Sequence, residues 1–378
     1  MKFVAGTTTQ PAANPARASG GLATFDPDVR VAVVGYGYWG SKHMRVLSSM
    51  PGVQVTIVDQ DPERIAEARW AYPSAEAAHD LDDVLSRVDA VVVATPPTAH
   101  AAVALQALRQ GRHALVEKPL ATTVEDAQEM VDAAAASGVH LMAGHTFEYN
   151  AAVWKLKEII DSGELGRILY IDAARLSLGK YQRDCNVIWD LAPHDISIAS
   201  FLLGEVPRTA SVWANRHVGN RHADVAYLRL DFERAATHAF VRVSWLDPCK
   251  VRRVTVVGER KMAVYNDMSD NERIRVYDIG VDPADPGDHG ESHAMPVSYR
   301  TGDIVSPYIQ FNEPLLVQDS HFIDCIRTGA TPNTPGERGL DIVRVLAATD
   351  VAEASARPAF VAGSIDPAGA DRMREAVS

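Results

Sequence analysis

The chain has 378 residues, 47% of them hydrophobic and 23% charged, a composition typical of a globular protein with room for two domains. Its formal net charge of -12, with no visible basic stripe, argues against nucleic-acid binding, and no apolar run approaches the length of a membrane span. The three cysteines, Cys185, Cys249 and Cys325, lie far apart and indicate neither a disulfide framework nor a metal site, so a cytoplasmic location is the default expectation.

The beginning of the chain differs in composition from the rest. Residues 7–15 are small, polar and proline-containing, and they lack the apolar core of a signal peptide. We therefore expect residues 1–27 to form a disordered leader. The expected domains follow: a first domain over residues 28–146, a second domain over 147–360, and a C-terminal tail over 361–378.

The most informative motif begins where an apolar strand-like run ends at Gly35-x-Gly37-x-x-Gly40 and a helix-like segment follows. Gly35 permits a sharp turn, Gly37 lets the backbone approach a pyrophosphate, and Gly40 lets the helix pack close to the strand. The free N–H groups at the start of the helix would attract the anion. The predicted cofactor site also includes the two residues between the second and third glycines, Tyr38 and Trp39.

A second strand-like run over residues 53–58 ends at Asp59, near the spacing expected for the acid that binds the adenosine ribose. A carboxylate there accepts hydrogen bonds from the ribose 2′- and 3′-hydroxyls and repels a 2′-phosphate. No Arg directly follows it, so the sequence favours NAD over NADP. The alternative is that Asp59 only caps the turn that follows.

Strands and amphipathic helices alternate over the rest of the first domain. Helices are predicted at residues 62–70, 81–86, 99–109 and 123–136, and strands at 90–95, 113–117 and 139–143. Thr98 and Thr123 are the expected helix caps. The alternation predicts an α/β fold with a doubly wound parallel Rossmann sheet, whose ligands lie at the carboxyl ends of the strands.

From about Phe147 the pattern changes. After a helix over residues 151–160, strands are predicted at 168–176, 209–213, 223–232, 237–245, 251–257, 262–265 and 274–277. Their short polar connections predict an α+β domain with an open, mainly antiparallel sheet. Residues 280–302 are predicted to form a loop that serves as part of a lid or a subunit contact. Helices over 314–327 and 339–354 close the chain, and the last could pack back on the Rossmann domain.

Two clusters of candidate cofactor-binding residues lie at strand ends. Thr95, Pro96 and His100 follow one strand, where the ribose and pyrophosphate would pass. Glu117 and Lys118 end another, at the depth of a nicotinamide ring. The alternatives are an ordinary proline-rich turn for the first cluster and a surface lysine for the second.

A third cluster contains Asp190 and His194, which share one face if their segment is helical. An acid beside an imidazole can transfer a proton, and Asp195 could support the histidine. The alternative is a structural Asp–His pair. The further ligands that a metal requires are missing nearby.

The glycine motif, Glu117-Lys118-Pro119 and Asp190-x-x-x-His194, in this order, resemble the Gfo/Idh/MocA oxidoreductase family, over nearly the whole chain from Arg30 onward. The resemblance implies a Rossmann domain that binds a nicotinamide cofactor and a C-terminal sheet that closes the substrate pocket. It further implies oxidation or reduction of secondary alcohols of sugars, inositols and their derivatives. Lys118, Asp190 and His194 match the catalytic residues of the family.

Residues 144–150 and 175–190 resemble the branch of nucleotide-sugar and aminoglycoside 3-dehydrogenases. This resemblance implies hydride transfer from a sugar C3 to nicotinamide C4 in secondary-metabolite or cell-surface sugar biosynthesis, with a downstream aminotransferase as a candidate partner. The candidate substrate contacts are His145, Tyr149, Arg175, Lys180, Tyr181, Arg183, Asn186, Trp189 and His194. Lys180 and Arg183 would suit a diphosphate, whereas the overall acidity favours an aminoglycoside.

Several alternatives stay open at this point. The base is either His194, oriented by Asp190, or Lys118, which otherwise stabilises the substrate oxygen as a donor. The other candidate functions are an inositol dehydrogenase, an NAD-binding sensor without turnover, and a lyase or hydrolase that oxidises its substrate transiently. An open sheet with one uncovered face predicts a homodimer or homotetramer.

Overall fold

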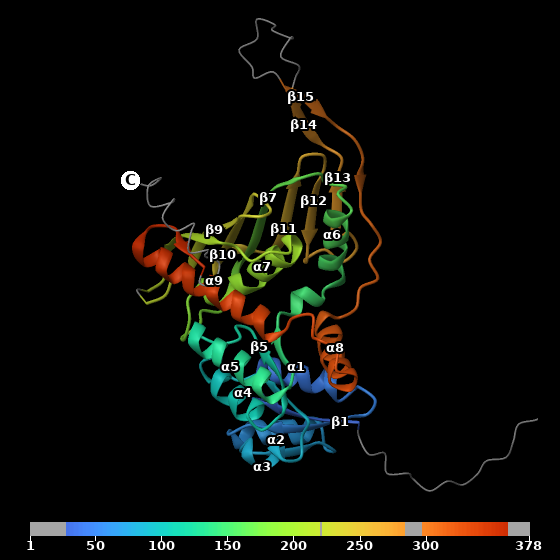
Figure 1. Ribbon diagram of the computed structural model, residues 1–378, viewed down its shortest axis with the longest axis vertical. Helices are drawn as coiled ribbons and strands as arrows, with labels where there is room; N and C mark the ends of the chain where they lie inside the picture. The colour runs from blue at the N-terminus through green and yellow to red at the C-terminus, as the bar shows by residue number, and fades with distance from the viewer. Residues whose placement is uncertain (1–27, 220, 284–296, 362–378) are drawn as a thin grey trace, which may run out of the picture.

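The computed structural model describes residues 28–219, 221–283 and 297–361, which form two large β-sheets with their covering helices (Figure 1). The first sheet and its helices lie at the bottom of the view, and the second sheet lies at the top. The expected leader and residues 362–378 of the expected tail lie outside the described residues.

The first sheet has six parallel strands in the order β3-β2-β1-β4-β5-β6, which confirms the predicted Rossmann fold. The strands are β1 (Val29–Val34), β2 (Val53–Val58), β3 (Glu76–Ala78), β4 (Ala90–Val93), β5 (His113–Glu117) and β6 (Leu141–Gly144). The helices are α1 (Tyr38–Leu47), α2 (Pro62–Ala71), α3 (Asp82–Leu85), α4 (His100–Leu108) and α5 (Val124–Ser137). Because the strand order reverses between β1 and β4, a crevice for a ligand opens at their carboxyl ends.

The helix caps of this domain follow the prediction at one position and differ at another. The Thr123 hydroxyl accepts the backbone N–H of Asp126 at 3.1 Å and caps α5. The expected cap at Thr98 is wrong, because a 3-10 turn (Pro97–Ala99) precedes α4 and no side chain caps that helix.

The second sheet has nine strands in the order β16-β13-β12-β11-β7-β10-β9-β8-β17. All neighbours are antiparallel except β7 and β10, so the mainly antiparallel prediction is confirmed. The strands are β7 (Ile168–Leu178), β8 (Thr209–Asn215), β9 (Val225–Phe232), β10 (Thr237–Ser244), β11 (Leu246–Gly258), β12 (Met262–Asn266), β13 (Ile274–Tyr277), β16 (Ile304–Val305) and β17 (Ala359–Phe360). Helices α6 (Ala151–Asp161) and α7 (Val187–Leu203) cover one face.

The prediction of a loop over residues 280–302 is wrong near both ends, because the described residues there form two strands that project beyond the second sheet (Figure 1). Strand β14 (Gly280–Pro283) pairs with β15 (Val297–Arg300), and Arg300 donates to the Asp282 carboxylate at 2.8 Å. Residues 284–296 lie outside the described residues. Residues 280–302 have the composition of a loop, but pairing between β14 and β15 determines the structure of the residues described at each end.

The last two helices pack against the parallel sheet, and the final one also packs against the second sheet. Phe322 and Ile323 of α8 (Pro314–Thr328) join one side of its core, and Leu340 and Val343 of α9 (Gly336–Ser355) join the other. The exact domain boundaries remain a prediction.

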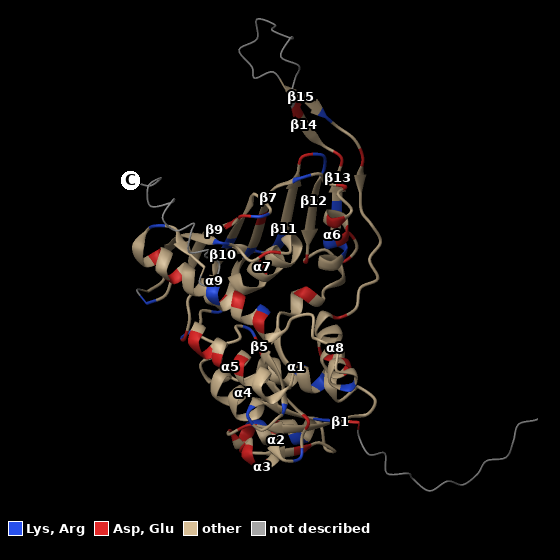
Figure 2. Cartoon of the chain, in the orientation of Figure 1, with Lys and Arg blue, Asp and Glu red and all other residues tan. Residues whose placement is uncertain are grey.

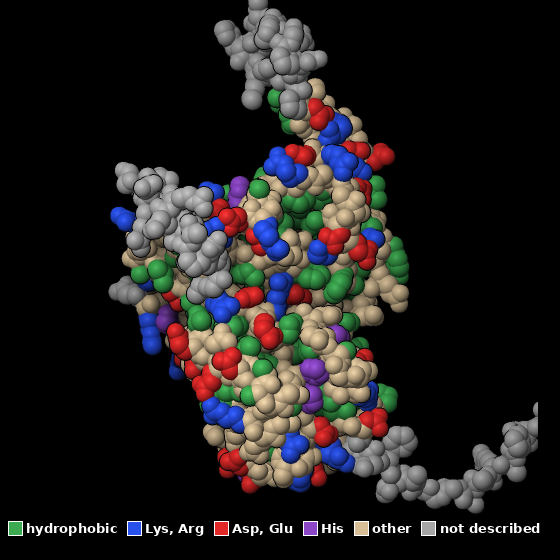
Figure 3. All heavy atoms as spheres, in the orientation of Figure 1, with side chains coloured by type: hydrophobic (Ala, Val, Ile, Leu, Met, Phe, Trp, Pro, Cys, Tyr) green, Lys and Arg blue, Asp and Glu red, His purple; other side chains and the backbone are tan. Residues whose placement is uncertain are grey.

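Charges of both signs are mixed over the molecule (Figure 2), and on the face in Figure 3 acidic and basic side chains are interspersed. Among the described residues, no helix has the combination of length and apolar character that crossing a bilayer requires. Within the same residues, no cluster of three or more histidine, cysteine or acidic side chains forms a metal site.

Candidate active site

The glycine turn between β1 and α1 has the geometry that a dinucleotide requires. Gly35 has a φ of +92°, and a Cβ on Gly40 would lie 1.7 Å from the Gly35 carbonyl oxygen. Gly37 is the N-cap of α1 and supplies no capping side chain. The first N–H groups of the helix therefore stay available for an anion such as a pyrophosphate.

Asp59, which follows the end of β2, stabilises the backbone of this turn through hydrogen bonds. Its carboxylate accepts the backbone N–H of Tyr36 at 2.7 Å and that of Asp61 at 2.9 Å. The neighbouring Asp61, rather than Asp59, caps α2 by accepting the N–H of Glu63. Arg64, which the sequence analysis does not single out, lies 3.6 Å from the Asp59 carboxylate.

A cavity of about 450 Å³, which we call the loop cavity, opens at the carboxyl ends of β4 and β5. The predicted site residues in its lining are Trp39, Thr95, His100, Glu117, Lys118, Asn186, Trp189 and Asp190. The Thr95 hydroxyl oxygen is buried without a hydrogen-bond partner among the described residues, and a bound ligand could satisfy it. Together with the glycine turn, this lining fits a nicotinamide dinucleotide.

His100 connects the two loops that form this cavity. Its ring nitrogens lie 2.8 Å from the Pro119 carbonyl oxygen and 2.9 Å from that of Thr95. Burial lowers the pKa of His100, although both carbonyl groups act in the opposite direction. Pro96 lies in the first of these loops but outside the cavity lining. His100 therefore fixes the loop backbone as well as lining the cavity.

Glu117 belongs to a buried network that reaches both α1 and α8. Its carboxylate accepts the backbone N–H of Lys118 at 3.1 Å and lies 3.0 Å from His43 Nε2. His43 Nδ1 lies 2.9 Å from Asp319. Burial alone would lower the pKa of His43, but Asp319 and Glu117 outweigh it and raise this pKa to about 10. His43 is therefore a cation between two carboxylates.

Lys118 is held by Asp190. Its Nζ donates to the Asp190 carbonyl oxygen at 2.7 Å and lies 3.4 Å from carboxylate oxygen Oδ1. The indole N–H of Trp245 donates to the other carboxylate oxygen at 3.0 Å. The expectation that Asp190 orients His194 is thus wrong, because its carboxylate contacts Lys118 and Trp245 instead.

His194 is buried next to several cations. Its Nδ1 has no hydrogen-bond partner among the described residues, and its ring packs edge-on against Phe147 with centroids 5.0 Å apart. Burial, followed by the charges of Lys118 and Arg175, lowers the pKa of His194 well below its ordinary value. The imidazole is therefore neutral at neutral pH.

Arg175 and Asp195 form a buried pair of their own. The guanidinium donates to the carboxylate twice, at 2.9 and 3.0 Å, and lies over the Phe147 ring at 4.4 Å from its centroid. The prediction that Asp195 supports His194 is therefore wrong. Arg175 lies outside the lining of both cavities described here, and its contact with a substrate stays a prediction. Sequence could not show that these two residues satisfy each other.

His145 and Tyr149 are buried and lie outside the lining of both cavities described here. Burial lowers the pKa of His145 to about 3, with Arg338 and Lys118 adding to the effect, and neither ring nitrogen has a partner among the described residues. The Tyr149 hydroxyl lies 2.9 Å from that of Thr334, and only 3% of the residue is exposed. The prediction of Tyr149 as a substrate contact is wrong, because it is a core residue.

The segment between β7 and α7 also differs from expectation. Lys180, Tyr181 and Arg183 lie outside the lining of both cavities, and Tyr181 instead packs against Trp245 with centroids 5.3 Å apart. The segment contributes other residues to the loop cavity: Gln182, Asp184, Cys185 and Asn186. Asn186 additionally caps α7, and the Trp189 indole N–H donates to Asp350 at 2.9 Å.

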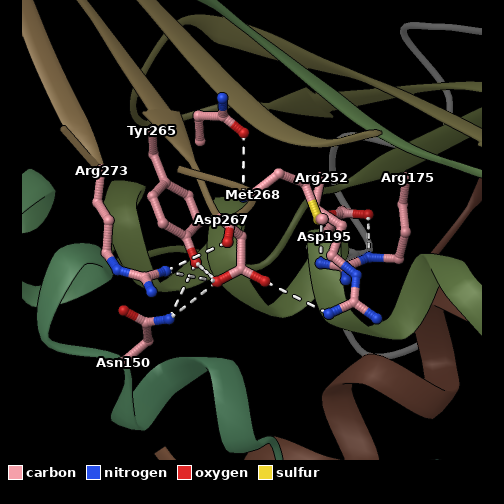
Figure 4. Close-up of polar contacts among 9 residues, drawn as sticks. Asn150, Arg175, Asp195, Arg252, Tyr265, Asp267, Met268 and Arg273 are labelled. Carbon is pink, nitrogen blue, oxygen red and sulfur yellow. Dashed lines mark hydrogen bonds and ion pairs between the residues drawn. The ribbon is translucent and has the colours of Figure 1, made fainter. Parts of the chain in front are cut away.

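A second cavity of about 410 Å³, which we call the sheet cavity, lies beside α1, where β12 ends and β13 begins, and Arg252 of β11 also lines it. It shares Trp39 and Glu117 with the loop cavity, and His194 lines it. The sequence analysis missed three charged residues of the second sheet that line this cavity: Arg252, Asp267 and Arg273 (Figure 4). They carry no local motif, because only the strand pairing brings them together.

This arrangement, with an open dinucleotide turn beside a lysine and a neutral histidine, is that of a nicotinamide-dependent oxidoreductase. Residues 29–145 match the family model described as an oxidoreductase family with an NAD-binding Rossmann fold, and residues 153–264 match the GFO/IDH/MocA C-terminal domain. The chain belongs to the Gfo/Idh/MocA family of oxidoreductases, and its first domain is the NAD-binding domain.

Several known proteins to which this chain is similar are oxidoreductases with different names. An uncharacterized oxidoreductase of Streptococcus pneumoniae is 30% identical, over 57% of this chain and 62% of that protein. Inositol 2-dehydrogenase 2 of Saccharopolyspora erythraea is 33% identical, over 52% of this chain and 60% of that protein. Both alignments span less than two thirds of the relative. The solved UDP-N-acetylglucosamine 3-dehydrogenase of Acidithiobacillus ferrooxidans has a TM-score of 0.71 and 25% identity, covering 86% of this chain and 98% of that one.

Proposed function

We propose that this protein is an NAD-dependent dehydrogenase that oxidises a secondary hydroxyl of a sugar or sugar derivative. The observation that carries the proposal is that Lys118 lines the loop cavity, His194 lines the sheet cavity, and the two cavities share Trp39 and Glu117. The charge of Lys118 contributes to the low pKa of His194. When bound, NAD⁺ supplies the hydride acceptor.

The surroundings of the two residues suggest a separate role for each. Lys118, fixed by Asp190, donates a hydrogen bond to the reacting oxygen and stabilises the negative charge that develops on it. His194, which lines the sheet cavity and whose Nδ1 has no hydrogen-bond partner among the described residues, is the proposed acceptor of the hydroxyl proton. Asp190 acts as a positioning residue for Lys118 and not as a partner of His194.

A nucleotide sugar oxidised at C3 is the substrate that we favour. The similarity to the UDP-N-acetylglucosamine 3-dehydrogenase over most of both chains supports this choice. Inositol is the second candidate, because the Saccharopolyspora relative is an inositol 2-dehydrogenase. A cytoplasmic location, a homodimer or homotetramer, and a downstream aminotransferase that consumes the ketone product complete the proposal.

The test measures NADH formation by the purified protein with NAD⁺ and UDP-glucose, UDP-N-acetylglucosamine, myo-inositol or an aminoglycoside, together with a carbonyl trap. We expect Lys118→Met and His194→Asn each to lower kcat by about 100-fold or more, with NAD⁺ affinity unchanged. Lys155→Met, on α6 and outside both cavities, where the lysine pairs with Glu158, is the matched control. NAD⁺ binding without NADH from any substrate would instead support a sensor, and elimination without net NADH a lyase.

A further inference from the structure

We propose that the substrate carries an anionic group, a carboxylate or a phosphate, that binds to Arg252 and Arg273 in the sheet cavity. The inference rests on the proposed function, because it specifies the substrate class for the site that contains His194. The two arginines come from different parts of the second sheet: Arg252 lies in β11, and Arg273 directly precedes β13. Figure 4 shows both side chains converging on Asp267.

The contacts between these arginines and Asp267 are long. Arg252 Nη1 lies 3.4 Å from one carboxylate oxygen, and Arg273 Nη1 lies 3.5 Å from the other. Charge-assisted hydrogen bonds ordinarily measure about 2.7–2.9 Å. The shorter bond to the Asp267 carboxylate comes from the Tyr265 hydroxyl, at 2.9 Å. Asp267 therefore only partly satisfies the two guanidinium groups.

Both guanidinium groups keep donors available. An arginine has five N–H donors, and among the described residues Arg252 makes one hydrogen bond, to Asp267. Arg273 uses Nη1 alone, and its Nε is buried without a partner. The Arg273 guanidinium lies 3.9 Å from the centroid of the Phe311 ring. A guanidinium covered on its face presents its edge, which matches the planar geometry of a carboxylate or two oxygens of a phosphate.

The charge balance of the lining also favours an anion. Asp267 is one carboxylate facing two guanidinium groups, and Lys42 adds another cation. Arg252 is close enough to His194 to help lower its pKa, so an anion at this position would lie near the reacting end of the substrate. A polycationic aminoglycoside would meet like charges there.

The other acidic residues of the lining have their own partners. Glu117 is paired with the cationic His43, and Glu313 forms an ion pair with Arg45 on α1. Among the described residues, neither carboxylate contacts Arg252 or Arg273. A substrate anion would contact both arginines.

The test is calorimetry on the NAD⁺-loaded protein with three probes: N-acetylglucosamine, its C6 carboxylate derivative, and UDP-N-acetylglucosamine. We expect at least one anionic probe to bind about 10-fold or more tightly than the neutral sugar, and the tighter one identifies carboxylate or phosphate as the anion. Arg252→Met should abolish the advantage, and Arg252→Lys should keep part of it. Arg275→Met, on β13 and bonded to Glu272, is the matched control.

Equal affinity for all three probes would overturn the inference, and so would an Arg252→Met variant that keeps the preference or weakens all probes alike. Thermal melting and NAD⁺ affinity verify the fold of each variant. Because binding is measured without turnover, a result can contradict the anion-binding inference without contradicting the proposed function, and the reverse also holds. Arginine-dependent anion binding without NADH would contradict only the dehydrogenase assignment.

Discussion

Asp190 determines where the Lys118 amine lies, and Trp245 determines where the Asp190 carboxylate lies. Trp245→Phe removes the indole donor but keeps most of the ring volume. We expect kcat to fall about 10-fold, because a hydrogen bond to a charged group contributes about 1.5–3 kcal/mol. Steady-state kinetics and NAD⁺ titration check this prediction. A purely structural role would lower the melting temperature and leave the kcat of the folded enzyme unchanged.

The preference for NAD⁺ over NADP⁺ also depends on single residues. Asp59→Ser should weaken NAD⁺ binding about 10-fold, because the acceptor for the ribose hydroxyls is lost. Binding of NADP⁺ should improve relative to NAD⁺, since the repelling carboxylate is gone and Arg64, which lies 3.6 Å from it, becomes available to a phosphate. Calorimetry with both cofactors measures the ratio. An unchanged ratio would show that Asp59 does not discriminate, and Asp61→Asn, which retains a capping residue, is the control.

At the scale of elements, His43 joins α1, β5 and α8 through its two carboxylate partners. His43→Ala leaves Glu117 and Asp319 buried together without a cation. The free energy of unfolding should fall by about 3–5 kcal/mol, as for other broken buried ion pairs. Denaturant unfolding measures the change, and His79→Ala, away from these elements, is the control. A loss below about 0.5 kcal/mol would mean that the network does not stabilise the interface.

The same network makes stability depend on pH. The pKa of His43 rises from its ordinary 6.5 to about 10 on folding, so the folded protein binds the proton more tightly. This contribution is complete below pH 6.5 and is lost as the pH rises toward 10. Between these limits the wild type should lose more stability than His43→Gln when both are unfolded at a series of pH values. Parallel curves would contradict the cationic state of His43.

A structural feature could be predicted when the residues that cause it lie close together in the sequence. The glycine turn and the Thr123 cap are local, because Gly35, Gly40 and Thr123 act within a few residues of their own positions. The sheet cavity is not local. The Asp267 backbone N–H donates to the Arg252 carbonyl oxygen at 2.9 Å only because β11 and β12 pair in one register, which sequence alone does not reveal.

In α7, helical spacing predicts which residues share a face of the helix but not which partners they contact. The interval between Asp190 and His194 is helical, as expected, but packing against Lys118 and Trp245 determines the partners of the acid. The core positions of Tyr149 and Arg175 likewise follow from contacts with Thr334 and Asp195. Such partners lie far away in sequence or on another element, so residue type alone indicates a substrate contact as readily as a structural one.

For the whole molecule, the uncovered face of the second sheet presents exposed aromatic side chains. They are Tyr170, Trp213, Tyr227 and Phe240. Trp213 pairs with Tyr227 across β8 and β9, and Tyr170 packs against Phe240. An apolar surface of this kind indicates a protein interface, and we expect two copies of the chain to bury it in a homodimer or homotetramer.

Light scattering coupled to size exclusion tests this expectation. The wild type should have the mass of a dimer or tetramer, and Trp213→Arg should shift it toward the monomer, because the charge would be buried at the interface. Trp70→Arg, at an 86% exposed position on α2, is the matched control. A monomeric wild type, or a Trp213→Arg variant with unchanged mass, would mean that another surface, or none, is used.

The central claim is that the site beside Lys118 and His194 serves oxidation of a secondary carbinol by NAD⁺. The most direct measurement takes the sugar that reacts fastest, carrying deuterium at C3, and determines the mass of the reduced cofactor. We predict that the cofactor gains one deuterium and that turnover slows relative to the unlabelled sugar. A reduced cofactor without deuterium would contradict oxidation at C3, and bound NAD⁺ that no sugar reduces would contradict the dehydrogenase assignment itself.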